Sequence, residues 1–172
     1  YVYATAAYDA GRLYVLSDDA SICALDPGSG RVLWHREADL VGTRGPPVGF
    51  DGDLYVVRNS YVQAFDGETG AELWSSLIRG GHSSGPAVAG ERVYASFAGP
   101  QVYAFDRQTG TELWHPEESA HGGGGHTPAL YRDRLYVRHV HGYVFGAANG
   151  SRLGTFRTED SVEPAFGLGK AF

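Results

Sequence analysis

Polar side chains that could bind a small anion are grouped just before four prolines of this chain, Pro47, Pro86, Pro128 and Pro164. Arginine, histidine, serine, threonine and glutamate all occur there. A fold that brought the four segments together would give these side chains one common surface. The candidate ligand-binding residues are Arg44, His82, Ser84, His121, His126, Thr127 and Glu163. Whether they meet depends on the elements that carry them.

The stretch from His121 to His126 holds four consecutive glycines between two histidines. Glycine lets the backbone approach a ligand closely, and neutral histidine is a common metal ligand. A metal site normally has a third ligand at a regular spacing, and none is present near this pair. His139 and His141 belong to a different hairpin turn. We therefore favour a flexible loop over a metal site, and we predict no metal-binding residue.

No residue pattern indicates a catalytic nucleophile. Cys23 directly precedes Ala24 in a strand-like segment, where an inert, buried thiol is expected. Ser83 and Ser84 lack the Gly-x-Ser-x-Gly turn that exposes the serine of many hydrolases. We predict no catalytic residue in this chain.

The composition excludes several classes of protein. The chain has 172 residues, of which 42% are hydrophobic and 20% are charged, as in a folded domain. The net charge of −6 argues against a nucleic-acid partner, because phosphates require a basic surface. Every apolar run is far shorter than the roughly 20 residues that span a bilayer. The 25 glycines and 11 tyrosines are typical of many short strands joined by tight turns.

A repeat of about 40 residues organises the chain. Trp34, Trp74 and Trp114 are separated by 40 positions each, and every one ends a similar phrase that reads Ala64-Phe-Asp-Gly-Glu-Thr-Gly-Ala-Glu-Leu-Trp74 in the second copy. Upstream of each phrase lies a Leu-Tyr-Val or Val-Tyr-Ala segment. A fourth copy of that segment, Leu135-Tyr136-Val137, continues the spacing.

Each repeat contains four short segments of β-branched and aromatic residues bounded by turn residues. Four strands in about 40 residues are typical of one blade of a β-propeller. The sequence therefore predicts an all-β fold of four-stranded antiparallel blades, present here as about four blades of a ring. We expect a single partial propeller over residues 1–172. Its blades cover about 4–42, 43–82, 83–124 and 125–162, and a fifth blade begins at 163–172.

The repeated phrase resembles the tryptophan-docking motif of pyrroloquinoline-quinone-type, or quinoprotein-like, β-propellers. The resemblance implies structural docking by nine residues, namely Asp26, Gly30, Trp34, Asp66, Gly70, Trp74, Asp106, Gly110 and Trp114. The fourth copy departs from the motif, since Gly146, Gly150 and Gly154 stand where Asp, Gly and Trp belong. We expect that blade to dock differently or to lie beside something that replaces the tryptophan.

The resemblance also implies a ring of about seven or eight blades. Three explanations of four blades stay open: part of a longer propeller, which we favour, a pair of copies that closes the ring, or packing on a different domain. In each case the loops entering the innermost strands form the mouth of a funnel. The candidate ligand-binding residues lie in these loops, so we expect them at the rim of that funnel.

Three functions are compatible with this resemblance. We favour a non-catalytic module of a larger bacterial protein, acting as a protein-interaction scaffold or a ligand-sensing domain and located outside the cytoplasm. One alternative is a fragment of a dehydrogenase with pyrroloquinoline quinone and Ca²⁺ in the funnel. The adjacent Cys-Cys pair of its alcohol dehydrogenase branch is missing here, and so are aspartates at the aligned positions. The other alternative is an assembly scaffold of the outer membrane. We expect no cofactor, no nucleic acid and no membrane span, and we expect as partner a protein, further blades or a second copy.

Overall fold

The computed structural model describes residues 6–17, 21–37, 45–58, 60–79, 84–97, 101–116, 126–138, 142–156, 166–167 and 170–171. These residues form four four-stranded antiparallel sheets and one short two-stranded sheet. The predicted all-β propeller class is thereby confirmed. Nothing in this part of the chain is a helix that could cross a membrane.

Each sheet is one blade, and its strands follow one another in chain order. The first blade contains β1 (Ala7–Asp9), β2 (Arg12–Leu16), β3 (Ile22–Leu25) and β4 (Val32–Arg36). The second contains β5 (Val48–Phe50), β6 (Asp53–Arg58), β7 (Tyr61–Asp66) and β8 (Glu72–Leu77). The third contains β9 (Ala87–Ala89), β10 (Arg92–Ser96), β11 (Val102–Asp106) and β12 (Glu112–Trp114). The fourth contains β13 (Ala129–Tyr131), β14 (Arg134–Arg138), β15 (Gly142–Gly146) and β16 (Arg152–Phe156). The two-stranded sheet pairs β17 (Phe166–Gly167) with β18 (Lys170–Ala171).

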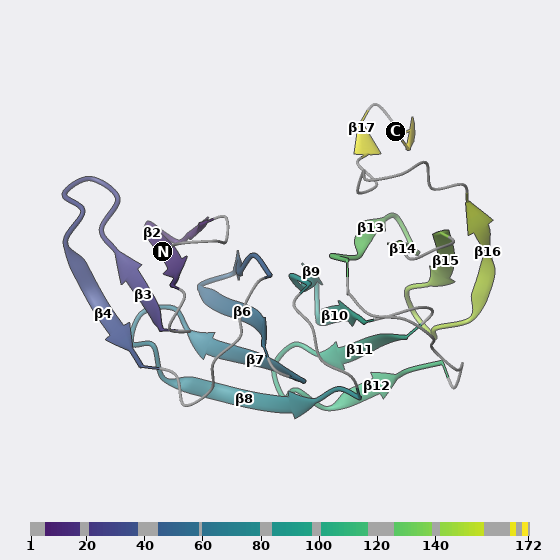
Figure 1. Ribbon diagram of the computed structural model, residues 1–172, viewed down its shortest axis with the longest axis horizontal. Helices are drawn as coiled ribbons and strands as arrows, with labels where there is room; N and C mark the ends of the chain where they lie inside the picture. Colours follow the sequence, from purple (N-terminus) through teal and green to yellow (C-terminus); the bar gives the residue numbers. More distant parts are fainter. Residues whose placement is uncertain are drawn as a thin grey trace.

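The blades follow one another along an open arc (Figure 1). The first strand of each blade lies on the inside of the arc, and β4, β8, β12 and β16 run along the outside. The inner strands β1, β5, β9 and β13 contact one another in succession. This arrangement brings the segments that lead into the inner strands to one end of the arc's inner wall.

The hydrophobic core is divided into three layers, one between each pair of neighbouring blades. The layer between the first two blades contains Tyr14, Leu54 and Phe65 from both sides. Alternation along each strand supplies these residues, because side chains of successive residues point to opposite faces of a sheet. A blade therefore offers one apolar face to each neighbour.

Every tight turn between the third and fourth strand of the first three blades is closed by an aspartate. In the second blade, Oδ1 of Asp66 accepts hydrogen bonds from the backbone N–H and the hydroxyl of Thr69, both at 2.7 Å. The N–H of Gly70 donates to the Asp66 carbonyl at 2.8 Å, and Gly70 has a φ of +74°. A side chain is strained in this left-handed conformation, which explains the glycine.

The indole of each tryptophan packs closely against the turn glycine of the next blade. A Cβ added to Gly70 would be 2.8 Å from the ring of Trp34, one on Gly110 would be 2.6 Å from Trp74, and one on Gly150 would be 2.5 Å from Trp114. Each indole N–H donates to a carbonyl of that same turn, at 2.9 Å, 2.9 Å and 3.2 Å. The accepting carbonyls belong to Gly67, Arg107 and Ala147.

The fourth blade lacks a tryptophan, and Phe156 partly takes its place. In the first three blades a tyrosine of the second strand packs against the tryptophan of the same blade, with ring centroids 6.0–6.1 Å apart. In the fourth blade the corresponding Tyr136 instead meets the edge of Phe156, at a centroid distance of 5.8 Å. Gly142 leaves room for this ring, because a Cβ there would lie 2.6 Å from Phe156.

Candidate functional site

The mouth, defined here as residues 45–47, 84–86 and 126–128, contains the segments that lead into β5, β9 and β13. Of the seven candidate ligand-binding residues, Ser84, His126 and Thr127 lie in this region. The other four, Arg44, His82, His121 and Glu163, lie outside the described residues. The described part of the site therefore consists of Ser84, His126, Thr127 and the residues around them.

The three segments of the mouth are in very close contact. A Cβ on Gly45 would lie 2.4 Å from the backbone of Ser84, and one on Gly85 would lie 2.7 Å from the Pro46 carbonyl. Real Cβ atoms do not approach backbone atoms so closely, so both positions require glycine. The backbone of one blade is thus fitted directly onto the backbone of the next.

The hydroxyl groups of the mouth bind backbone atoms. The Ser84 hydroxyl, with only 3% of the residue exposed, donates to the Ser96 carbonyl at 2.7 Å. The Ser96 hydroxyl in turn donates to the His126 carbonyl. The Thr127 hydroxyl oxygen accepts a hydrogen bond from the Gly85 N–H at 3.0 Å. The Ser84 hydroxyl therefore binds within the third blade. The bonds from Gly85 to Thr127 and from Ser96 to the His126 carbonyl join the third blade to the fourth.

These residues do not provide the oxygen set that a quinone cofactor with Ca²⁺ requires. Ca²⁺ prefers carboxylate, amide and carbonyl oxygens, usually six to eight of them. The described mouth residues are glycine, proline, serine, threonine and histidine, with no carboxylate among them. Within the described part of the chain, no group of three or more His, Cys, Asp or Glu residues could hold a metal ion.

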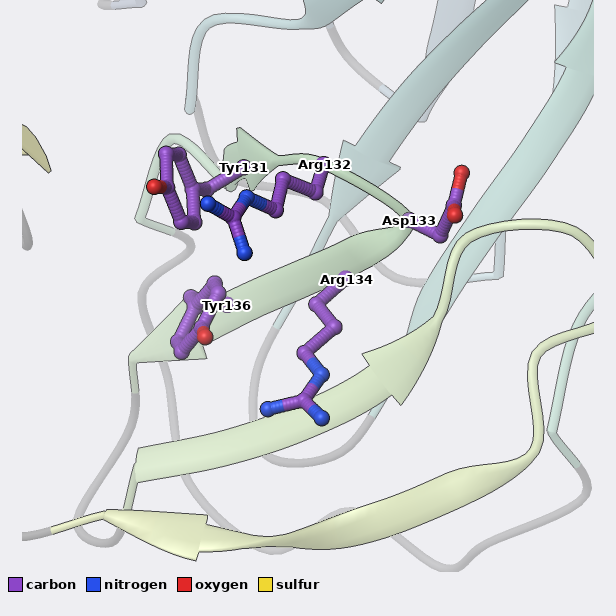
Figure 2. A pocket seen from close by; sticks show the side chains of 5 residues that line it. All are labelled: Tyr131, Arg132, Asp133, Arg134 and Tyr136. Carbon is purple, nitrogen blue, oxygen red and sulfur yellow. The ribbon is translucent and has the colours of Figure 1, made fainter. Parts of the chain in front are cut away.

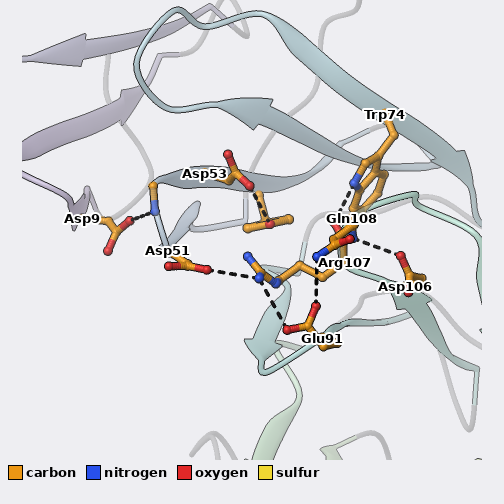
Figure 3. Close-up of polar contacts among 10 residues, drawn as sticks. Asp9, Asp51, Asp53, Trp74, Glu91, Asp106, Arg107 and Gln108 are labelled. Atoms are coloured by element: carbon orange, nitrogen blue, oxygen red, sulfur yellow. Dashed lines mark hydrogen bonds and ion pairs between the residues drawn. The ribbon is translucent and has the colours of Figure 1, made fainter.

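A charged group that sequence analysis missed lies at turns of the second and third blades, and we call it the cross-blade cluster (Figure 3). Its members are Asp51, Asp53, Tyr55, Glu91 and Arg107. The Arg107 side chain, with 10% exposed, lies 3.1 Å from Asp51 of the second blade and 3.7 Å from Glu91 of its own blade. Its guanidinium carbon is 5.4 Å from the centre of the Phe50 ring.

Burial shifts the pKa of two acidic side chains of this cluster. Burial raises the pKa of Tyr55 to about 12, and its hydroxyl donates to Asp53 at 3.3 Å. Burial also raises the pKa of Asp53, although the hydrogen bond from Tyr55 opposes the shift. The carbonyl of Arg107 accepts the indole N–H of Trp74, so the cluster and the docked indole share one turn. The arrangement is that of a structural junction between two blades.

A cavity of about 320 Å³ lies on the fourth blade (Figure 2). It is lined by Tyr131, Arg132, Asp133, Arg134 and Tyr136. Arg132 reaches between the two tyrosines, with its guanidinium carbon 5.2 Å from the Tyr131 ring, and Asp133 points the other way. Leu135 and Val137 pack toward the third blade, so Tyr136 between them faces away from it. The cavity therefore lies on the face of the fourth blade that is turned away from the third.

The sequence comparisons point to one family. The family model described as outer membrane protein assembly factor BamB matches residues 2–166. A curated protein of that name from Nitrosomonas eutropha is 37% identical over 73 residues, which are 42% of this chain and 18% of that protein.

The structural comparisons show the propeller fold. BamB from Moraxella catarrhalis has a TM-score of 0.75 at 17% identity, over 90% of this chain and 49% of that one. A quinohemoprotein alcohol dehydrogenase from Pseudomonas putida HK5 has a TM-score of 0.74 at 20% identity, over 92% of this chain and 34% of that one. The computationally designed Ika8 protein has a TM-score of 0.79 at 13% identity, over 94% and 52%. This chain thus spans about half or less of the length of these proteins.

Proposed function

The chain belongs to the family described as outer membrane protein assembly factor BamB, whose model matches residues 2–166, and we propose that it is a non-catalytic scaffold for the assembly of outer-membrane proteins. Family membership is the observation that carries this proposal. The propeller offers a rigid frame, and its loops are free to vary without loss of the fold. The partner is a protein, and the site of action is the cell envelope outside the cytoplasm.

The chemistry of the mouth supports a scaffold over an enzyme. The Ser84 hydroxyl binds within the third blade and the Thr127 hydroxyl joins the third blade to the fourth, so both hydroxyls are engaged without any ligand. His126 contributes its backbone carbonyl to the same chain of bonds, and it stays a candidate for contacting the partner on the grounds given by the sequence. The four remaining candidates for ligand binding at the rim are supported by the sequence alone, namely Arg44, His82, His121 and Glu163.

Deleting the gene in the organism that makes the protein tests this proposal. We expect a lower amount of folded outer-membrane proteins, measured as the fraction that resists unfolding by SDS at room temperature. The wild-type gene and a His35→Ala variant, which changes an exposed outer-strand residue, should restore that fraction. An unchanged fraction after deletion would contradict the proposal.

A titration of the natural protein with pyrroloquinoline quinone and Ca²⁺ separates the scaffold from a dehydrogenase. A ligand that binds only the folded state must raise the melting temperature, by an amount set by its concentration and affinity. We expect no saturable change in melting temperature or tryptophan fluorescence. A saturable rise in melting temperature together with dye-linked alcohol oxidation would contradict the scaffold proposal and indicate a dehydrogenase.

A further inference from the structure

The turn between the third and fourth strands of the fourth blade differs chemically from the same turn in the other blades. It contains Asn149, Gly150 and Ser151 where the second and third blades have Thr-Gly-Ala and Thr-Gly-Thr. Asparagine followed by glycine is the dipeptide that loses its side-chain amide most easily, because glycine is flexible and has no side chain to hinder attack by its nitrogen. The only other asparagine of the chain, Asn59, precedes Ser60. The fourth turn is therefore where this chemistry is favoured.

The asparagine side chain is folded back into this turn. Oδ1 of Asn149 accepts the Ser151 N–H at 3.1 Å, as the Thr69 hydroxyl accepts the Ala71 N–H at 3.2 Å in the second blade. Gly146 stands in place of the turn aspartate and makes room for the asparagine, since a Cβ added there would lie 3.0 Å from the same Oδ1. Asn149 is exposed, so water and hydroxide can reach its amide.

Gly150, whose nitrogen would be the nucleophile, is held by contacts on both sides. Its N–H donates to the Gly146 carbonyl at 2.8 Å, and its φ is +70°. The ring of Trp114 lies 2.5 Å from the position of a Cβ added to Gly150. The Trp114 N–H and the Tyr94 hydroxyl both donate to the Ala147 carbonyl of the same turn, each at 3.2 Å. Attack on the preceding side-chain amide requires the glycine N–H to leave its acceptor and the peptide to rotate, and the docked indole blocks that rotation.

From these contacts we propose that Asn149 is a site of spontaneous deamidation whose rate is controlled by opening of the junction between the third and fourth blades. In the opened turn the Gly150 nitrogen gives up its proton and attacks Cγ of Asn149, a C–N bond forms, and the side-chain nitrogen leaves as ammonia. One water molecule then opens the succinimide ring at either carbonyl, which gives aspartate or isoaspartate. Isoaspartate adds a methylene group to the backbone before Gly150, so the turn no longer fits beneath Trp114 and the junction is weakened.

Peptide mapping of the natural protein by mass spectrometry, during incubation at mildly alkaline pH, tests the proposal. Asn149→Thr, which introduces the residue of the second and third turns, should abolish the signal and so identifies it. We expect the folded protein to deamidate at least about tenfold more slowly than the same protein unfolded in urea. Trp114→Ala should speed the reaction of the folded protein at least about tenfold, because it removes the docked indole. Trp34→Ala, at the distant first junction, should change the rate by less than about twofold. Equal rates in folded and unfolded protein, or equal rates in the two tryptophan variants, would overturn the proposal.

Hydrogen exchange of the unmodified protein decides the question where Trp114→Ala does not fold. The Gly150 amide exchanges when its bond to the Gly146 carbonyl breaks, which is the same opening that deamidation needs. We expect folding to slow deamidation and Gly150 exchange by factors that agree within about threefold. A protected Gly150 amide with deamidation as fast as in urea would contradict control by the junction. The isoaspartate form, separated by its additional negative charge, should melt at a lower temperature than the unmodified protein, and an equal melting temperature would contradict the weakening of the junction.

Discussion

At the scale of single residues, the turn aspartates show how a repeated sequence becomes a repeated structure. Oδ1 of Asp26, Asp66 and Asp106 accepts hydrogen bonds from the serine or threonine three residues later. These bonds from Ser29, Thr69 and Thr109 lower the pKa of each aspartate. The ionised carboxylate is therefore the form that holds the turn closed.

This lowering predicts a pH dependence of stability. A group with a lowered pKa in the folded state stabilises fully above its unfolded pKa, about 3.9 for aspartate, and loses that contribution as pH falls through the folded value. We expect Asp66→Asn to lower the urea midpoint at pH 7 and to approach the wild-type midpoint near pH 2. Glu68→Gln, in the same turn, is the control for loss of charge. A constant difference between Asp66→Asn and wild type from pH 7 to pH 2 would contradict this explanation.

Single residues also mark the limit of what the sequence could predict about the site. Ser84 and Thr127 were predicted as ligand-binding residues at the rim of the funnel, and that role stays a prediction, while in the structure their hydroxyls are engaged by backbone atoms. Arg107 gave no signal, because it occupies a turn position that holds Pro27, Gly67 and Ala147 in the other blades. Its partners Asp51 and Glu91 come from different hairpins, so only the three-dimensional arrangement brings them together.

At the scale of the strands, the sequence predicted most of the fold. Alternating apolar residues and turn signals recur every 40 positions, and they specify four strands in each blade. The β-bulge between the third and fourth strand was not predicted, although it recurs in all four blades, at Ala24/Leu25, Ala64/Phe65, Ala104/Phe105 and Val144/Phe145. It depends on the register between two strands. The pairing of Tyr136 with Phe156 was missed for a similar reason, because Phe156 lies two residues beyond the motif position.

The close contact between the segments of the mouth leads to a prediction for Thr127. Thr127→Val keeps the shape of the side chain but leaves the Gly85 N–H without its acceptor. An unsatisfied, partly buried N–H costs about 1–3 kcal/mol, so we expect the free energy of unfolding to fall by about that amount. Thr155→Val, at an exposed position of β16, should change it by less than about 0.5 kcal/mol. Urea denaturation measures both, and similar values for the two variants would place Thr127 outside the inter-blade contact.

At the scale of the whole molecule, the blades are joined one to the next, and no blade buries its apolar faces alone. In such a repeat the stability is approximately a sum of blade terms and nearest-neighbour interface terms. Each junction between the described blades contains a docked indole, a layer of apolar side chains and, between the second and third blades, the cross-blade cluster. The junction between the second and third blades lies in the middle of the four described blades. We therefore expect it to determine whether the two halves unfold together.

Urea unfolding of Trp74→Ala, beside His126→Ala, tests the role of the docked indole most directly. Trp74 is 8% exposed, and loss of a buried tryptophan typically costs about 3–5 kcal/mol. We expect Trp74→Ala to lower the midpoint strongly and to split the single transition, seen by far-UV circular dichroism, into two. His126→Ala should leave the midpoint and the single transition nearly unchanged. Equal losses in the two variants, or one unaltered transition in Trp74→Ala, would show that the indoles do not hold the blades together.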